Sequence, residues 1–170
     1  MITNIGSTVY TALLNQGQNN PSFTITLINS AGSTDTVYFE SSGSYRISAV
    51  ATARGNQLPD GGKATVMRVG SGTAEPEVDD YALGSQFADN VLAPTGMAYS
   101  TTGSGSPIYT GNFTNMSNET QTITELGIYL ADRFQSNYTD FYLFVHELLN
   151  EPIEVQPNET VVLAYELAFN

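Results

Sequence analysis

Apolar and polar side chains alternate along much of this chain, most clearly in its last ten residues. Five large apolar side chains would share one face of an extended backbone there: Val161, Leu163, Tyr165, Leu167 and Phe169. A period of two is typical of a β-strand with a buried face. Because the other face carries Val162, Ala164 and Ala168, we expect a second sheet, a neighbouring subunit or the N-terminal residues to cover it.

The same period of two recurs along the chain and predicts further strands. Strands are expected at 22–28, 35–40, 63–70, 91–100, 107–115, 121–131, 141–149 and 160–169, with a short edge strand at 153–155. The turn sequence "SAGST" makes 22–40 a hairpin. Residues 44–54 fit a strand or a helix, because three alanines accompany the alternation, and residues 7–14 fit a strand or a short helix.

Short strands separated by Gly, Pro and Asn turns favour an all-β fold. About eight to ten strands with little helix are expected to form an antiparallel β-sandwich or a jelly roll. Residues 1–20, with the polar segment "NQGQNNP" at 15–21, are typical of a terminal arm. We therefore expect an extended N-terminal arm at 1–20 and a single β-sandwich domain at 21–170.

The charge balance excludes several classes of partner. The chain has seventeen acidic residues and five basic ones, for a formal net charge of −12. Binding to nucleic-acid phosphates or to an anionic membrane needs clustered Lys and Arg, so we expect neither partner. No apolar run approaches the roughly 20 residues of a membrane span. The chain has no cysteine, which excludes disulfides, Cys-ligated zinc and a thiol nucleophile.

His146, the one histidine, is the main candidate for catalysis. Alternation would place it on the face of Tyr142, Phe144 and Leu148 in an apolar strand. It could act as a general base, but the chain has neither a Gly-X-Ser-X-Gly elbow nor a cysteine to supply the nucleophile. A half-buried strand histidine or an interface contact is the better interpretation, and we expect no catalytic residue and no cofactor.

The loop 71–86 carries the densest acidic group and two nearby glycines. Glu75, Glu77, Asp79 and Asp80 could hold calcium, but the loop lacks the spacing of a calcium-binding loop. A solvated loop, with Asp79 or Asp80 capping a short helical turn at 78–83, is favoured, and no metal site is expected. We attribute Gly70 and Gly72 to turn geometry, because the acidic residues behind them would repel phosphate.

Three stretches resemble structural proteins of tailed bacteriophages. The first is "RVGSGTAEPEVDDYALGSQ" at 68–86, and the second is "GNFTNMSNETQTITELGIYL" at 111–130. The third is a turn that leads into the final strand, with Pro152, Ile153, Val155, Pro157, Glu159 and Thr160 matching. Their order and spacing resemble virion β-sandwich proteins, a class that includes capsid decoration proteins, head fibres and tail or baseplate components.

The resemblance implies a virion protein, assembled in the host cytoplasm, that decorates or stabilises the capsid through contacts between subunits. Its partners would be the major capsid protein or other virion proteins, and it would form a homo-oligomer, expected to be a trimer. The interface candidates are Tyr142, Phe144, His146, Leu148, Val162, Ala164 and Ala168. The alternatives are a tail, baseplate or fibre component that contacts the host surface or a glycan, and a hydrolase that depends on His146.

Overall fold

The computed structural model describes residues 1–4, 23–39, 65–101, 106–131 and 141–167. Eight strands make up nearly all the regular structure in these ranges: β1 (Phe23–Ile28), β2 (Thr34–Phe39), β3 (Thr65–Gly70), β4 (Leu92–Thr101), β5 (Pro107–Asn115), β6 (Gln121–Ala131), β7 (Phe141–Val155) and β8 (Thr160–Glu166). The all-β fold class predicted from the sequence is confirmed.

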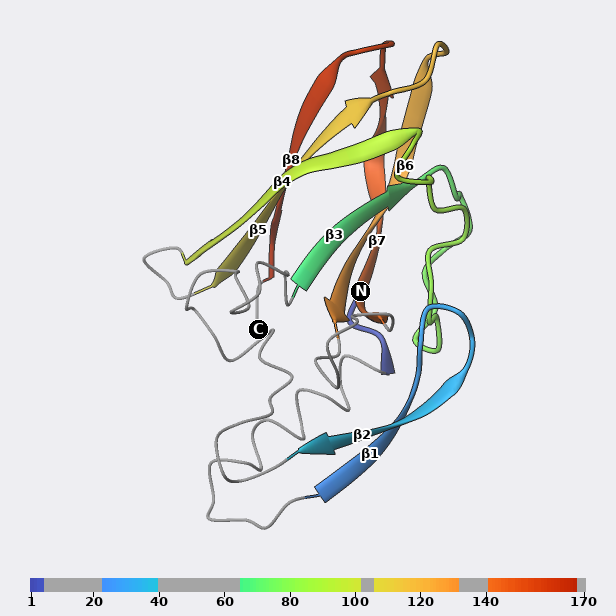
Figure 1. The fold of residues 1–170 in the computed structure, drawn as a ribbon, viewed down its shortest axis with the longest axis vertical. Coiled ribbons are helices and arrows are strands. Elements are labelled where there is room, and N and C mark those ends of the chain that lie inside the picture. The colour runs from blue at the N-terminus through green and yellow to red at the C-terminus, as the bar shows by residue number, and fades with distance from the viewer. Residues whose placement is uncertain (5–22, 40–64, 102–105, 132–140, 168–170) are drawn as a thin grey trace.

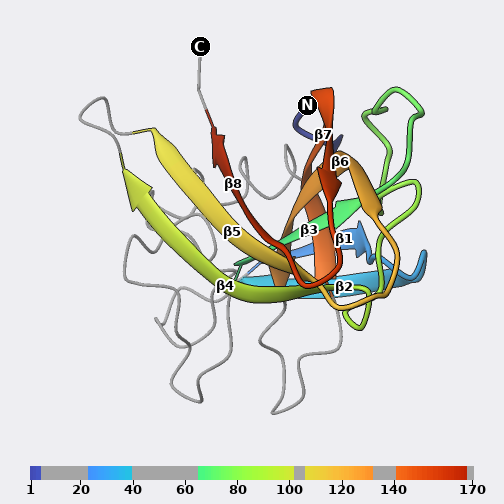
Figure 2. The same ribbon diagram turned by 90° about the horizontal axis from the view of Figure 1, so that it is seen from above.

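The strands form three antiparallel sheets (Figures 1 and 2). One sheet has the order β3-β6-β7 and a second has the order β4-β5-β8, while β1 and β2 form a separate two-stranded sheet. Figure 1 shows β1 and β2 below the two larger sheets. The turn between β1 and β2 lies beside the start of β7, where the Ser30 N–H donates to the Phe141 carbonyl oxygen at 2.7 Å.

The hairpin predicted over 22–40 is confirmed by β1 and β2. Its turn is closed by the Asn29 side-chain oxygen, which accepts hydrogen bonds from the Ala31 N–H at 3.0 Å and the Ser33 N–H at 2.9 Å. Gly32 adopts a left-handed backbone with φ of 79°, a conformation that disfavours residues with a Cβ atom. The turn sequence therefore determines where the hairpin reverses.

β7 is longer than the predicted strand at 141–149. It continues through Pro152 to Val155, so the predicted edge strand at 153–155 is the last part of β7. The pairing with β6 shifts between these two parts, because Ile123 pairs with Ile153 whereas Glu125 pairs with Leu148. The predictions for residues 7–14 and 44–54 lie outside the described residues.

The two three-stranded sheets share one hydrophobic core. β3, β6 and β7 contribute a set of buried side chains to it: Met67, Val69, Ile123, Leu126, Ile128, Leu130, Tyr142, Phe144, Val145 and Val155. The other sheet and its flanking residues contribute Leu92, Tyr109, Phe113, Leu163 and Leu167. In β8 the alternation places Leu163 in this core and leaves Val162 63% exposed. Among the described residues, nothing covers the outer face of β8.

β6 is buried on both faces, so its sheet lies between two layers. Ile128 and Leu130 face the shared core. On the opposite face, Tyr129 packs with Leu83 and Leu143 in a second, smaller cluster. Leu83 belongs to the loop 71–86, which therefore covers the face of the β3-β6-β7 sheet that is turned away from β4, β5 and β8. The candidate site lies under this loop.

A β-bulge in β7 determines which way His146 points. Ile128 pairs with Val145 and Tyr129 pairs with Leu143, so Phe144 has no partner on β6. A bulge inserts one extra residue and changes the side-chain alternation beyond it. The predicted placement of His146 on the face of Tyr142 and Phe144 is therefore wrong, because His146 lies on the face covered by the loop.

The first four residues lie along the outer edge of β7. Ile2 forms an isolated bridge with Val145, and the Thr3 N–H donates to the Phe144 carbonyl oxygen at 3.2 Å. The Thr3 hydroxyl donates to the Leu143 carbonyl oxygen at 2.6 Å. These contacts cover part of an otherwise open strand edge. The rest of the predicted arm at 1–20 lies outside the described residues.

Candidate functional site

The carboxylate of Glu125 binds the loop 71–86 to the sheet beneath it. Its two oxygens accept hydrogen bonds from the backbone N–H groups of Gly72 at 2.9 Å, Ser85 at 2.8 Å and Gly84 at 3.0 Å. Glu125 is 1% exposed. Burying a carboxylate is very unfavourable unless its oxygens are paired. The three donors, together with His146, provide this pairing.

His146 lies between two carboxylates. Its Nε2 atom is 2.9 Å from Glu125 Oε2, and its Nδ1 atom is 2.6 Å from Asp80 Oδ2. A neutral imidazole can donate only one hydrogen bond, whereas the protonated ring donates two. The ring therefore donates to at least one of the two carboxylates and contacts both. We refer to Asp80, Glu125 and His146 as the Glu125 cluster.

The two glycines at the start of the loop leave room for the carboxylate. A Cβ atom on Gly72 would lie 2.5 Å from Glu125 Oε1, and one on Gly70 would overlap both the same atom and the Ser85 carbonyl oxygen. Among the described glycines, positive φ occurs only at Gly32. The prediction that turn geometry explains Gly70 and Gly72 is therefore wrong, because close approach of a side chain requires them.

Asp80 does not cap a helix. The predicted helical turn at 78–83 is absent from the described loop, which has only a short turn there. The Asp80 carboxylate instead accepts a hydrogen bond from the Glu77 N–H at 2.8 Å and contacts His146 with the same oxygen. Glu75, Glu77 and Asp79 are exposed. The acidic group thus divides into one residue of the Glu125 cluster and three solvated residues.

Tyr129 holds the loop at a second point. Its hydroxyl oxygen accepts a hydrogen bond from the Leu83 N–H at 2.9 Å. Tyr129 is fully buried, and this burial raises the pKa of its hydroxyl to about 12. The guanidinium of Arg68 lies over the rings of Phe141, at 4.7 Å, and Tyr129, at 5.8 Å. Aromatic and polar contacts therefore extend from the Glu125 cluster toward the edge strand β3.

A second buried polar side chain joins the turns at the other end of the molecule. Asn115 is fully buried, and its amide nitrogen donates to the carbonyl oxygens of Glu119 at 2.7 Å and Val155 at 2.8 Å. Its side-chain oxygen accepts the Ser117 N–H at 2.9 Å. The Asn158 N–H, in a left-handed residue with φ of 64°, donates to the Asn115 carbonyl oxygen at 2.8 Å. These bonds join the turn 116–120 to the turn 156–159.

The Glu125 cluster is suited to holding the loop and poorly suited to catalysis. Both ring nitrogens of His146 contact carboxylates, and the ring is buried at 3% exposure. A general base needs a free nitrogen within reach of a substrate proton.

Within the described ranges, no group of three or more His, Cys, Asp or Glu residues could hold a metal ion. In the same ranges, no helix is long and apolar enough to cross a membrane.

The interface candidates divide into buried and exposed residues. Tyr142, Phe144 and His146 are buried inside the chain's own fold, so no neighbouring subunit is needed to explain their apolar surroundings. Leu148 is half-buried, whereas Val162 and Ala164 are exposed. Ala168 lies outside the described residues. A contact with another subunit stays a prediction, and the exposed face of β8 is the part of this set that is free to make it.

Sequence reasoning missed Glu125 and Asn115. A glutamate in an alternating strand resembles a solvent-facing residue, but Glu125 shares its face with Gly127 and Tyr129, a poor composition for a solvated face.

No protein-family model, curated protein or solved structure matches the chain. The resemblance to phage proteins therefore depends on the three stretches themselves.

Proposed function

We propose that the chain is a structural protein of a bacteriophage virion that decorates or stabilises the capsid through contacts between subunits. We also propose that its two three-stranded sheets form the β-sandwich of that class. One observation carries the proposal: the three stretches that resemble virion proteins are joined by two buried side chains. Glu125, in the second stretch, binds the first stretch through Gly72 and Gly84. Asn115, also in the second stretch, binds the third through Val155.

This arrangement suits a mechanical role. A loop without regular secondary structure is expensive to order, yet here buried hydrogen bonds at Glu125 and Tyr129 hold it on the sheet. Buried polar contacts of this kind fix one arrangement, because a shifted loop leaves charged and polar groups unpaired. A rigid surface loses little conformational freedom when it docks onto a shell.

The contact surface that we propose is the outer face of the β4-β5-β8 sheet. Val162 and Ala164 are exposed there and pair with Asn112 and Thr110 of β5. None of these four residues is charged, although the chain has a formal net charge of −12. The exposed Glu166 lies on the same face at the end of β8, so the uncharged part is the patch around Val162 and Ala164. Such a patch can pack against a neighbouring subunit without desolvating charges. The partner would be another copy of the chain, in a trimer, or the major capsid protein.

Val162→Asp tests this surface. Because Val162 is 63% exposed, the substitution should leave the thermal unfolding midpoint nearly unchanged, while a buried charge at the interface should abolish association. The measurement is light scattering coupled to size-exclusion chromatography, with Thr122→Asp, an exposed position on β6, as the matched control. A wild-type protein that stays monomeric at high concentration would contradict the oligomer.

The location on the particle tests the function itself. Antibody-gold labelling of purified virions should place gold over the head. Gold confined to the tail would instead support a tail, baseplate or fibre component that contacts the host surface or a glycan. The exposed side chains of Val78 and Tyr81, 52% and 43% accessible, favour this second candidate, because solvent-facing aromatic residues often belong to binding surfaces. Particles without gold would rule out both assignments.

A further inference from the structure

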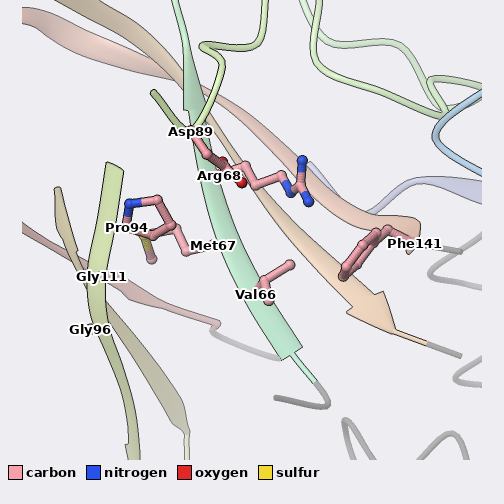
Figure 3. Close-up of a pocket in the computed structure, with 8 residues that line it drawn as sticks. All are labelled: Val66, Met67, Arg68, Asp89, Pro94, Gly96, Gly111 and Phe141. Carbon is pink, nitrogen blue, oxygen red and sulfur yellow. The ribbon is translucent and has the colours of Figure 1, made fainter. Parts of the chain in front are cut away.

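A cavity of about 250 Å³ lies between the edges of the two three-stranded sheets (Figure 3). Eight residues line it: Val66, Met67, Arg68, Asp89, Pro94, Gly96, Gly111 and Phe141. Three of them are consecutive in β3, whose side chains alternate between the faces of the sheet. A cavity that touches all three therefore lies along the strand edge. β3 is an edge strand of its sheet, and β4 is an edge strand of the other.

Within the described residues, the backbone groups on the outer edge of β3 are unpaired beside this cavity. Farther along the same edge, the Val69 carbonyl oxygen accepts the Phe87 N–H at 3.0 Å, and the Ser71 N–H donates to the Ser85 carbonyl oxygen at 2.9 Å. Backbone groups point to the same side at every second residue of a strand, so those of Met67 also point outward. No hydrogen bond joins them to another described residue, although Met67 is only 3% exposed. Buried main-chain groups without partners are rare and costly.

The cavity has a positive charge on one side. Arg68 makes no ion pair within the described residues, although the chain has 17 acidic residues. Its guanidinium lies 4.7 Å over the ring of Phe141 and extends away from Asp89 in Figure 3. An arginine held flat on an aromatic ring still has its in-plane N–H groups free to bind a carboxylate. The site therefore combines an apolar cavity, a main-chain donor and acceptor, and a cation.

We propose that this edge binds an extended segment of a partner protein as an added strand along β3, with an apolar side chain in the cavity and a neighbouring Asp or Glu on Arg68. The partner residue opposite Met67 would exchange two main-chain hydrogen bonds with it. Residues opposite each other share a face of the sheet, so that residue's side chain would enter the cavity beside Met67. The next side chain would point to the opposite face, which carries Arg68.

The volume and charge favour a peptide segment over a small-molecule ligand. Sites for drug-sized ligands occupy about 300–1,000 Å³, whereas about 250 Å³ fits one or two aliphatic side chains. A small acid could pair with Arg68 but would leave the main chain of Met67 unpaired. This inference is independent of the proposed function, because a free strand edge can bind a segment of a head, tail or non-virion protein.

The test uses the full chain and a fluorescein-labelled, acetylated peptide of alternating serine and threonine with leucine–glutamate at its centre. Binding is measured by fluorescence anisotropy. Replacing the glutamate by glutamine should weaken binding about tenfold or more, because a charge-assisted hydrogen bond is lost. Replacing the leucine by alanine should also weaken it about tenfold or more. N-methylation of the leucine should abolish binding, because it removes the donor to Met67.

Two protein variants change the charge beside the cavity in opposite directions. Arg68→Gln should abolish the difference between the glutamate and glutamine peptides. Asp89→Asn should strengthen binding of the glutamate peptide, because a like charge is removed. Glu77→Gln, an exposed acid outside the cavity, is the matched control and should leave binding unchanged. Circular dichroism establishes that each variant keeps the wild-type fold.

Three results would overturn the proposal. The first is an absence of binding by the leucine–glutamate peptide at millimolar concentration. The second is binding that N-methylation does not affect, which would place the peptide on another surface. The third is displacement of the peptide by hexanoate with the same dependence on Arg68 and a comparable affinity, which would assign the site to small carboxylic acids.

Discussion

Replacing Glu125 by glutamine should destabilise the protein strongly, although the two side chains have nearly the same shape. In the wild type, Oε1 accepts the N–H groups of Gly72 and Ser85, and Oε2 accepts that of Gly84 and faces His146. Glutamine has one acceptor oxygen and one amide nitrogen, which is only a donor. Whichever atom takes each position, at least one backbone N–H faces another donor.

The magnitude follows from these contacts. At least one charge-assisted hydrogen bond from a backbone N–H is lost, and such bonds contribute about 1.5–3 kcal/mol each. His146 also loses its contact with a buried carboxylate oxygen, and leaving a buried polar group unpaired costs about 1–3 kcal/mol. Because both effects involve the same carboxylate, they overlap, and we expect a total loss of about 3–5 kcal/mol. That is a large part of the stability of a typical domain, about 5–15 kcal/mol.

The assay is urea-induced unfolding at neutral pH, with the free energy of unfolding obtained by linear extrapolation. Glu75→Gln is the matched control, because Glu75 lies on the same loop and is exposed. It should change the free energy of unfolding by less than about 0.5 kcal/mol. Limited proteolysis should also cut the loop 71–86 faster in Glu125→Gln than in the control. A cost below about 1 kcal/mol for Glu125→Gln would refute the view that this carboxylate holds the loop.

Further substitutions and conditions test the other contacts. Gly72→Ala should lower the free energy of unfolding by about 1–3 kcal/mol, because its Cβ would overlap the buried carboxylate. Gly84→Ala is the control, because the atom nearest to its Cβ, Glu125 Oε2, would be 3.7 Å away. Equal costs in urea unfolding would contradict the steric argument. Asn115→Asp should lower the free energy of unfolding by about 2–4 kcal/mol, because a carboxylate oxygen would replace the amide nitrogen that donates to two carbonyl groups. Asn118→Asp, at an exposed position, should be nearly neutral. A similar loss of stability in both variants would refute the role of the buried amide. The pKa of the Tyr129 hydroxyl is raised from 10.0 in the unfolded chain to about 12 in the folded protein. Its contribution to the free energy of unfolding is therefore fully present below pH 10. That contribution is lost as the pH rises to about 12, because the unfolded chain releases the proton first. The loss should be about 2–3 kcal/mol, and urea unfolding between pH 9 and pH 12 that shows a steeper fall in the wild type than in Tyr129→Phe would support it.

The strands could be predicted from the sequence because their signal is local. In β5, burial alternates at every residue, with Tyr109 and Phe113 facing the core. The same rule fails at His146, because it assumes an unbroken alternation and the bulge at Phe144 adds one residue. Nothing in the local pattern marks that residue, since Phe144 and Val145 are both apolar and both belong to the core.

The candidate site could not be assembled from the sequence because its parts are distant in the chain. His146 contacts Asp80 across 66 positions and Glu125 across 21. Each of the three has an ordinary local explanation: a strand histidine, a loop acid and a polar strand residue. Only the loop's return over the sheet brings them together, and this return depends on the space that Gly70 and Gly72 leave for the carboxylate.

Residues within the stretches that resemble phage proteins maintain the fold. Within the three stretches, Gly72, Glu125 and Asn115 bind parts of the same chain to one another. A pattern that maintains the fold can occur equally in head and tail proteins, because both would need the same internal contacts. The particular function must therefore depend on surfaces that these contacts leave free. In the described part of the chain, the outer face of β8 and the edge of β3 are two such surfaces, so variants at Val162 and Arg68 test function where variants at Glu125 test only the fold.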